Sequence, residues 1–208
     1  NTYGDNNIAI GFSALNANTT GGANVGIGMQ SLVNNTTGYY NTAVGASSLR
    51  QNTWGTNNTA IGLNAMVSNT TGIQNTSLGQ QSLQANTTGS NNVALGQGAL
   101  YWNTTGISNV AVGNQALGNA TITSYNSAVG YQSMFTNTTG DYNTAVGYSS
   151  LYANTTGIYN TAIGSNALDT NTIGQQNTAI GVNALQSNIT GNNNVAVGFR
   201  SLDSSTTD

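Results

Sequence analysis

The sequence predicts an all-β protein, a parallel β-solenoid (β-roll) of about 12 seventeen-residue coils. The first observation behind this prediction is a glycine that returns at a constant interval, as from Gly11 to Gly28, with no insertion or deletion. The second is that its neighbours return too, as in NTAVG at 143–147 and NTAIG at 160–164. Fixed-period repetition is typical of architectures in which each unit buries its apolar side only against its neighbours. The recurring glycines are Gly11, Gly28, Gly45, Gly62, Gly79, Gly96, Gly113, Gly130, Gly147, Gly164, Gly181 and Gly198.

Each coil is numbered here from the Asn that precedes the motif, so that Asn7 is position 1 of the first complete coil. The consensus is then N-[T/V]-A-[I/V]-G-x-x-[A/S]-[L/M]-x-x-N-T-T-G-x-x. Position 4 is always aliphatic and position 9 is always Leu or Met, whereas positions 3 and 8 are always Ala, Ser or Gly. We expect two short strands per coil, which place the side chains of positions 4 and 9 in the core.

The polar positions predict the corners of the coil. Asn occupies position 1 in every coil and position 12 in most, and stacked Asn side chains can form amide ladders. Glycine at positions 5 and 15 permits backbone conformations that other residues resist. The NTTG corner is replaced once, by Ala120-Thr121-Ile122-Thr123, where we expect a local bend or contact.

Other folds fit the repeat less well. Glycine and β-branched residues crowd each coil and no apolar period of 3.6 persists, which disfavours helices. The Asn-Gly and Asp-Gly pairs of tight hairpins are missing from the sequence. We therefore expect residues 1–208 to form one continuous array, about 58 Å long at about 4.8 Å per coil. Neither end resembles a capping unit, which suggests a window of a longer fibre.

The composition narrows the function. The chain has two Lys or Arg, five Asp or Glu, and no His or Cys. Without a basic stripe, nucleic-acid binding has no electrostatic basis. No apolar run reaches the ~18 residues of a membrane span, so we expect no membrane insertion of this segment.

The sequence also lacks the residue types that most catalytic sites need. Ser or Cys nucleophiles have no His, Glu or Lys as a base, and metal sites and cofactors lack ligands. The one carboxylate pair worth weighing is Asp169 and Asp203, two coils apart and so about 10 Å apart, near the spacing of inverting glycosidases. Isolated surface aspartates are the simpler interpretation, and we expect no enzyme activity and no cofactor.

The motif NTAIG, with its variants NVAVG and NSAVG, resembles the repeats in the heads of trimeric autotransporter adhesins. The longer unit NTAIGxxALxxNTTGxx also resembles repeats of tail-fibre-like surface proteins of bacteria and phages. The resemblance implies a left-handed parallel β-roll that assembles as a homotrimer. The length of the coil in this chain departs from the adhesin pattern.

Aromatic residues recur at fixed positions in successive coils. They occupy positions 17, 6 and 10, where they predict either rings that stack for stability or a surface strip that binds a sugar or another partner. The strip comprises Tyr125, Tyr131, Phe135, Tyr142, Tyr148, Tyr152 and Tyr159.

Two further surface patterns have simple and functional interpretations. The sequon Asn-x-Thr at position 12 marks the corner of the coil, or else glycosylation sites that would solubilise a weakly charged rod. Thr at positions 13 and 14 could form an ice-binding array, although neighbouring residues of an extended strand face opposite sides. The sequons lie at Asn18, Asn35, Asn69, Asn86, Asn103, Asn137, Asn154 and Asn188.

Together these patterns predict a structural and adhesive segment of an extracellular fibre or filament, at a cell surface or on a virion. A phage tail fibre or spike segment that binds a host surface is the first alternative, and an ice-binding solenoid is the second. The expected partners are further copies of the chain, in a homo-oligomer, and environmental or host glycans.

Overall fold

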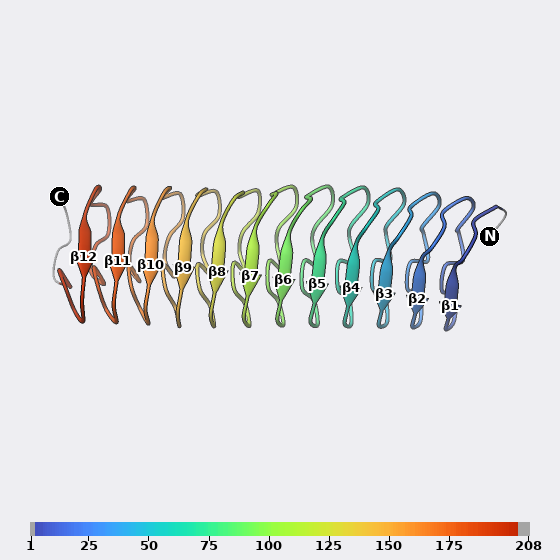
Figure 1. Cartoon of the computed structure of the whole chain (residues 1–208), viewed down its shortest axis with the longest axis horizontal. Helices are drawn as coiled ribbons and strands as arrows, with labels where there is room; N and C mark the ends of the chain where they lie inside the picture. The colour runs from blue at the N-terminus through green and yellow to red at the C-terminus, as the bar shows by residue number, and fades with distance from the viewer. Residues whose placement is uncertain (1–2, 204–208) are drawn as a thin grey trace. The chain divides into compact units, whose positions relative to one another are not determined.

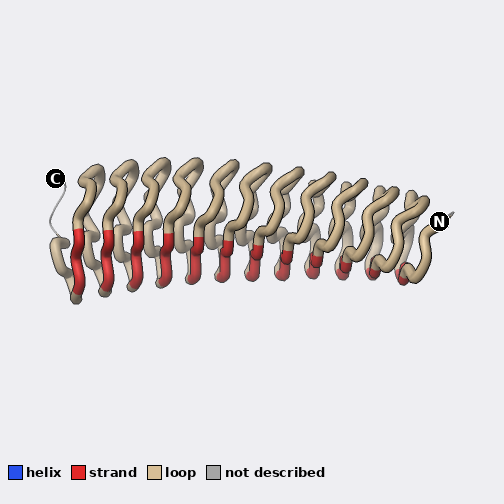
Figure 2. Tube along the Cα trace, turned by 45° about the horizontal axis from the view of Figure 1, so that its top comes forward, coloured by secondary structure: helices blue, strands red, loops and turns tan. Residues whose placement is uncertain are grey.

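The computed structural model describes residues 3–203, and these residues form an all-β parallel β-solenoid without a helix. The chain divides into two compact units, 1–105 (unit 1) and 106–208 (unit 2). Each coil contributes one strand of three residues, at positions 2–4, and the rest of the coil is turns and bends (Figures 1 and 2). The coil length and the parallel architecture predicted from the sequence are confirmed.

Unit 1 contains six parallel strands in chain order: β1 (Ile8–Ile10), β2 (Val25–Ile27), β3 (Thr42–Val44), β4 (Thr59–Ile61), β5 (Thr76–Leu78) and β6 (Val93–Leu95). Unit 2 contains six more: β7 (Val110–Val112), β8 (Ser127–Val129), β9 (Thr144–Val146), β10 (Thr161–Ile163), β11 (Thr178–Ile180) and β12 (Val195–Val197). Within each unit the strands pair with a register of one repeat, so that Thr42 faces Thr59 and Ala43 faces Ala60. Equivalent positions therefore stack into ranks along each unit.

The core differs from the prediction at position 4. Ala43 and Ala60, at position 3, are fully buried, whereas the aliphatic side chains at position 4 are half-buried or exposed, such as Leu78 at 47%. The prediction that position 4 fills the core, and the prediction of two strands per coil, are wrong. Successive side chains of a strand point to opposite faces, so positions 1 and 3 face inward and positions 2 and 4 face outward.

Leu or Met at position 9 fills the interior instead, as predicted for this position. Leu49, Met66 and Leu83 are fully buried. A β-carbon added to Gly26, at position 3, would lie 3.4 Å from Cγ of Leu15. The interior therefore has room for one large side chain per coil and for small residues opposite it, which is why Ala dominates position 3.

The turns depend on left-handed backbone conformations. The residue at position 9 has a positive φ in every described coil, for example 50° at Met66, as do the residues at positions 7 and 17. Such conformations are uncommon for residues other than glycine and cost energy, so packing must hold them in place. Gly62 at position 5 has a φ of +135°, and a β-carbon there would lie 2.5 Å from the carbonyl oxygen of Gly79. Alanine cannot replace this glycine without moving the backbone.

The predicted amide ladders are confirmed at both Asn positions. At position 12, Nδ2 of Asn52 donates to Oδ1 of Asn35 at 2.8 Å and to the carbonyl oxygen of Gly55 at 3.0 Å. At position 1, Nδ2 of Asn41 donates to Oδ1 of Asn24 at 3.1 Å. Because these side chains are buried, hydrogen bonding along the ladder satisfies amide groups that would otherwise be costly to desolvate.

Ala120 interrupts the position-12 ladder, and a local contact forms there as expected. Thr123, which replaces the position-15 glycine, is fully buried. Its Oγ1 accepts hydrogen bonds from Nδ2 of Asn126 and, at 3.4 Å, from Nδ2 of Asn137. The threonine hydroxyl thus supplies an acceptor where the asparagine is missing.

Candidate functional site

The predicted aromatic strip forms three separate stacks in unit 2. At position 17, the ring centroids of Tyr125 and Tyr142 lie 4.9 Å apart with 6° between planes, and those of Tyr142 and Tyr159 lie 5.1 Å apart with 13°. The rings of Tyr131 and Tyr148, at position 6, lie 5.5 Å apart. Those of Phe135 and Tyr152, at position 10, lie 5.6 Å apart.

The backbone sets the geometry of the position-17 stack. All three tyrosines have φ values near +60°, and each backbone N–H is bonded to the preceding coil, such as Tyr159 N to the carbonyl oxygen of Asp141 at 3.2 Å. The coil spacing therefore fixes the ring spacing, and the rings lie nearly parallel because their backbones are equivalent. Offset parallel rings stabilise one another beyond the area that they bury.

The environment of Tyr142 is distinctive because it stands between two other tyrosines. Desolvation by the surrounding protein, followed by repulsion from ionised Tyr125, Tyr159 and Asp141, raises the pKa of its hydroxyl. The Asp141 carboxylate is held nearby, since Oδ1 accepts a hydrogen bond of 2.8 Å from the backbone N–H of Ser124. The stack therefore favours neutral tyrosine.

These stacks leave little room for a ligand between rings. Two rings with centroids about 5 Å apart occupy each other's faces, whereas a sugar on a ring face needs about 3.5–4 Å on each side. Stacking for stability is the interpretation that this geometry favours. The three tyrosines are about half exposed.

The predicted glycosylation sites lie in the interior of the coil. The side chains at position 12 are buried, as at Asn69 and Asn154. The Nδ2 atom that would carry a glycan donates instead to the preceding ladder asparagine, at 2.8 Å for both residues. This geometry disfavours glycosylation of the folded coil. The described sequons are Asn18, Asn35, Asn69, Asn86, Asn103, Asn137, Asn154 and Asn188, and each is buried.

The threonine hydroxyls at position 13 are hydrogen-bonded to the backbone, and the threonine rank at position 14 is interrupted by other residues. At position 13, Oγ1 of Thr70 donates to the carbonyl oxygen of Thr87 at 3.0 Å, and equivalent bonds recur in both units. At position 14, Trp54, Ile122 and Ile173 interrupt the threonine rank. The surface predicted for ice binding therefore lacks a continuous array of free hydroxyls.

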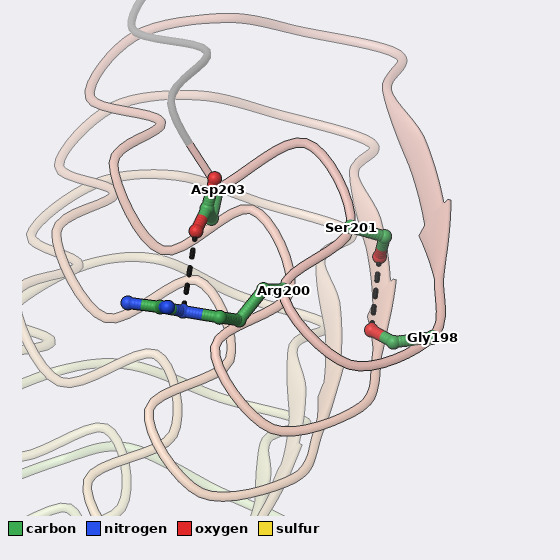
Figure 3. Close-up of polar contacts among 4 residues, drawn as sticks. All are labelled: Gly198, Arg200, Ser201 and Asp203. Carbon is green, nitrogen blue, oxygen red and sulfur yellow. Dashed lines mark hydrogen bonds and ion pairs between the residues drawn. The ribbon is translucent and has the colours of Figure 1, made fainter.

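The two aspartates considered as a carboxylate pair have different environments. Asp203 forms an ion pair of 3.4 Å with Nε of Arg200 (Figure 3). Burial raises the pKa of Asp169. In the same coil as Arg200, Oγ of Ser201 donates to the carbonyl oxygen of Gly198 at 3.1 Å, and this bond supports the corner (Figure 3).

Within residues 3–203, no group of three or more His, Cys, Asp or Glu side chains could hold a metal ion. No helix of the described chain is long and apolar enough to cross a membrane.

Two further surfaces lie outside the sites described above. The first is the outward face of the strands, formed by positions 2 and 4, which carries exposed aliphatic side chains in both units. The second is a recess of about 220 Å³ in unit 1, bordered by Asp5, Tyr39 and Tyr40 around the small residues Gly22 and Ala23. Aligning the coils reveals its signal, a Gly-Ala pair at positions 16 and 17 where the next coil has Tyr-Tyr.

Comparison with known proteins gives no relative for this chain. No protein-family model, curated protein or solved structure matches it.

Proposed function

We propose that the chain is a structural and adhesive segment of an extracellular fibre, in which the coils form a uniform shaft that associates with further copies of itself. The observation that carries this proposal is the outward strand face. Every coil places an aliphatic side chain at position 4 beside Thr, Val, Ile or Ser at position 2. A repeated apolar surface of this kind is typical of an interaction surface.

The exposed fractions support self-association through this face. Leu78 in unit 1 is 47% exposed, and Ile163 in unit 2 is 40% exposed. None of the seven charged residues of the chain occupies position 2 or position 4. A face that remains in water usually carries charges that oppose association, so a second copy is the partner that this face fits best.

The finer features of the assembly follow the resemblance of the repeats. We propose left-handed coils and a homotrimer with strand faces toward the partner chains, located at a cell surface or on a virion. In a phage tail fibre or spike, the same shaft would present binding residues to a host surface. The ice-binding alternative has less support, because the position-13 hydroxyls are bonded to backbone carbonyls.

Sedimentation and light scattering test the proposal. We expect the unmodified chain to be oligomeric at micromolar concentration, and we expect Leu78→Asp combined with Ile163→Asp to shift it toward monomers. Because each side chain is already 40–47% exposed, a charge there should lower the free energy of unfolding by no more than about 1 kcal/mol per site. Circular dichroism should therefore stay unchanged.

The matched control places the same charges elsewhere. Thr71→Asp combined with Thr156→Asp alters exposed position-14 residues in the same two units and should leave the oligomeric state intact. A monodisperse monomer of the unmodified chain would contradict the proposal. So would equal effects of the two double variants.

A further inference from the structure

The recess in unit 1 arises because one coil has small residues where its neighbours have large ones. Gly22 and Ala23 occupy positions 16 and 17, between Asp5 and Asn6 of the preceding coil and Tyr39 and Tyr40 of the following coil. The backbone is continuous through it, since Ala23 N donates to the carbonyl oxygen of Asp5 at 2.9 Å and Tyr40 N to that of Gly22 at 3.1 Å. The recess therefore forms because the side chains of Gly22 and Ala23 are small, while the backbone hydrogen bonds between the coils are kept.

The Tyr39 ring and Gly22 are in close contact at the floor of the recess. A β-carbon added to Gly22 would lie 3.2 Å from Cε1 of Tyr39, so this ring lies directly over the glycine. Tyr3 and Thr20, both at position 14, complete the lining. Three tyrosines and one carboxylate thus surround a space of about 220 Å³.

The tyrosine faces in the recess differ from those of the stacks in unit 2. The rings of Tyr39 and Tyr40 are tilted by 44° with centroids 6.2 Å apart, so neither covers the other's face as Tyr142 does for Tyr125. Tyr3 and Tyr40 are well exposed. Ring faces are therefore available here to a ligand.

We propose that this recess binds one sugar residue of a neutral glycan. The C–H groups of a pyranose carry small positive charges that suit the negative faces of the tyrosine rings. Its hydroxyl groups can donate to the Asp5 carboxylate, in a charge-assisted hydrogen bond. The Asn6 amide and the Thr20 hydroxyl can both donate and accept.

Charge and size narrow the ligand class. Of the described residues that line the recess, Asp5 alone is charged, so it disfavours anionic sugars such as sialic acids. The volume lies below the roughly 300–1,000 Å³ of pockets that enclose drug-sized ligands, which fits one ring with the rest of the glycan in solvent.

This inference rests on the proposed role of the chain as an adhesive segment of a fibre. A shallow site for one sugar binds weakly, with a Kd on the order of 1 mM. Presentation of several copies of the site in one oligomer would raise the apparent affinity through avidity. Self-association and glycan binding would then act together in adhesion.

Binding is measured first on an array of neutral gluco-, galacto- and manno-configured oligosaccharides, and then by saturation-transfer NMR with the methyl glycosides of these sugars. We expect the unmodified chain to bind at least one of the three configurations. Ala23→Tyr should reduce binding by at least about tenfold, because the new ring fills the recess. This variant should fold, since position 17 carries tyrosine in four other coils with φ of 58–61°, close to the 53° of Ala23.

Two more variants locate the contacts. Asp5→Asn, which keeps the shape of the side chain, should weaken binding by several-fold, whereas Tyr159→Ala, in unit 2, should leave binding unchanged. Equal binding by the Ala23→Tyr variant, or no binding of any array sugar by the unmodified chain, would overturn the inference. Preferential binding of tetramethylammonium over the glycosides would also overturn it, because three tyrosines and a carboxylate could enclose an organic cation.

The oligomeric state is followed in the same samples. If the unmodified chain self-associates but binds no sugar, the proposal of a sugar site in the recess fails and the proposed assembly stands. A monomeric chain that still binds sugar would count against the proposed assembly and leave the recess site standing.

Discussion

Nδ2 of Asn137 donates a hydrogen bond to Oγ1 of Thr123 at 3.4 Å, where other position-12 asparagines donate to an asparagine of the preceding coil. The usual ladder bond is shorter, as between Nδ2 of Asn154 and Oδ1 of Asn137 at 2.8 Å. Ala120 and Thr123 therefore act as a compensating pair, in which a longer bond replaces the normal one.

Repair of this pair should stabilise unit 2. The double substitution Ala120→Asn with Thr123→Gly restores the consensus corner and a good acceptor for Asn137, and we expect a gain of about 1–2 kcal/mol in the free energy of unfolding. Each single substitution should be destabilising, because Thr123→Gly removes the acceptor and Ala120→Asn crowds Thr123. Denaturant melts of the four proteins form a double-mutant cycle, and additive effects would contradict the pairing.

Loss of a ladder amide should be costly. Asn52→Ala removes three hydrogen bonds of 2.8–3.0 Å, including the one that the buried Oδ1 of Asn35 accepts. We expect the free energy of unfolding to fall by about 2–4 kcal/mol. Asn57→Ala is the control, because this exposed asparagine has one side-chain bond of 3.3 Å to Thr56. Thermal melts should separate the two variants, and similar midpoints would show that the ladder contributes little.

Glycine at position 5 should resist substitution far more than glycine at position 7. Gly62→Ala would force a β-carbon against Gly79 at a φ of +135°, and we expect a loss of at least about 2 kcal/mol. Gly98, with a φ of 64°, stands where other coils carry Asn or Gln at similar values. Gly98→Asn should therefore change stability by less than about 0.5 kcal/mol. Comparable losses in denaturant melts would disprove the distinction.

Alkaline pH should destabilise unit 2 through Tyr142. Its pKa is raised from 10.0 in the folded protein, so above pH 10 the unfolded chain loses this proton first. The contribution of the Tyr142 hydroxyl to the free energy of unfolding is fully present below pH 10, and it is lost as the pH rises through the pKa of the folded protein. Between about pH 5 and 9 almost nothing titrates, and the melting temperature should stay nearly constant.

Tyr142→Phe supplies the matched variant, since it keeps the ring stack and removes the hydroxyl. The alkaline decline in melting temperature should be smaller in this variant than in the unmodified chain. Tyrosinate absorbance should show one late-titrating group missing from it. Identical alkaline profiles would exclude Tyr142 as a source of the decline.

Much of the architecture could be predicted because the repeat carries it directly. The interval between glycines gives the register, and the invariance of Asn7 and its equivalents reveals the ladder. The direction of position 4 could not be predicted. A three-residue strand is too short to show which face is inside. Core residues are mostly apolar, but apolar residues are also common at the surface, so a large aliphatic side chain need not be buried. Ile61 is larger than Ala60, yet Ala60 is the buried residue.

The candidate site was harder to predict for a related reason. Recurrence revealed Tyr125, Tyr142 and Tyr159, but recurring equivalent rings stack and cover one another. The recess depends on Gly22 and Ala23, which are departures from the aromatic pattern. Sequence periodicity reveals what is repeated, whereas a hollow forms where the repetition fails.

The one-repeat register also determines how a unit would respond to tension. Each coil is hydrogen-bonded to its immediate neighbours, as Thr42 N is to the carbonyl oxygen of Asn58 and Gly62 N is to that of Val44. A force that pulls on one end loads the bonds of the outermost coil first, so coils should peel away in sequence. Each released coil would add about 60 Å of extended chain, which makes a stack of equal coils a stepwise extensible tether.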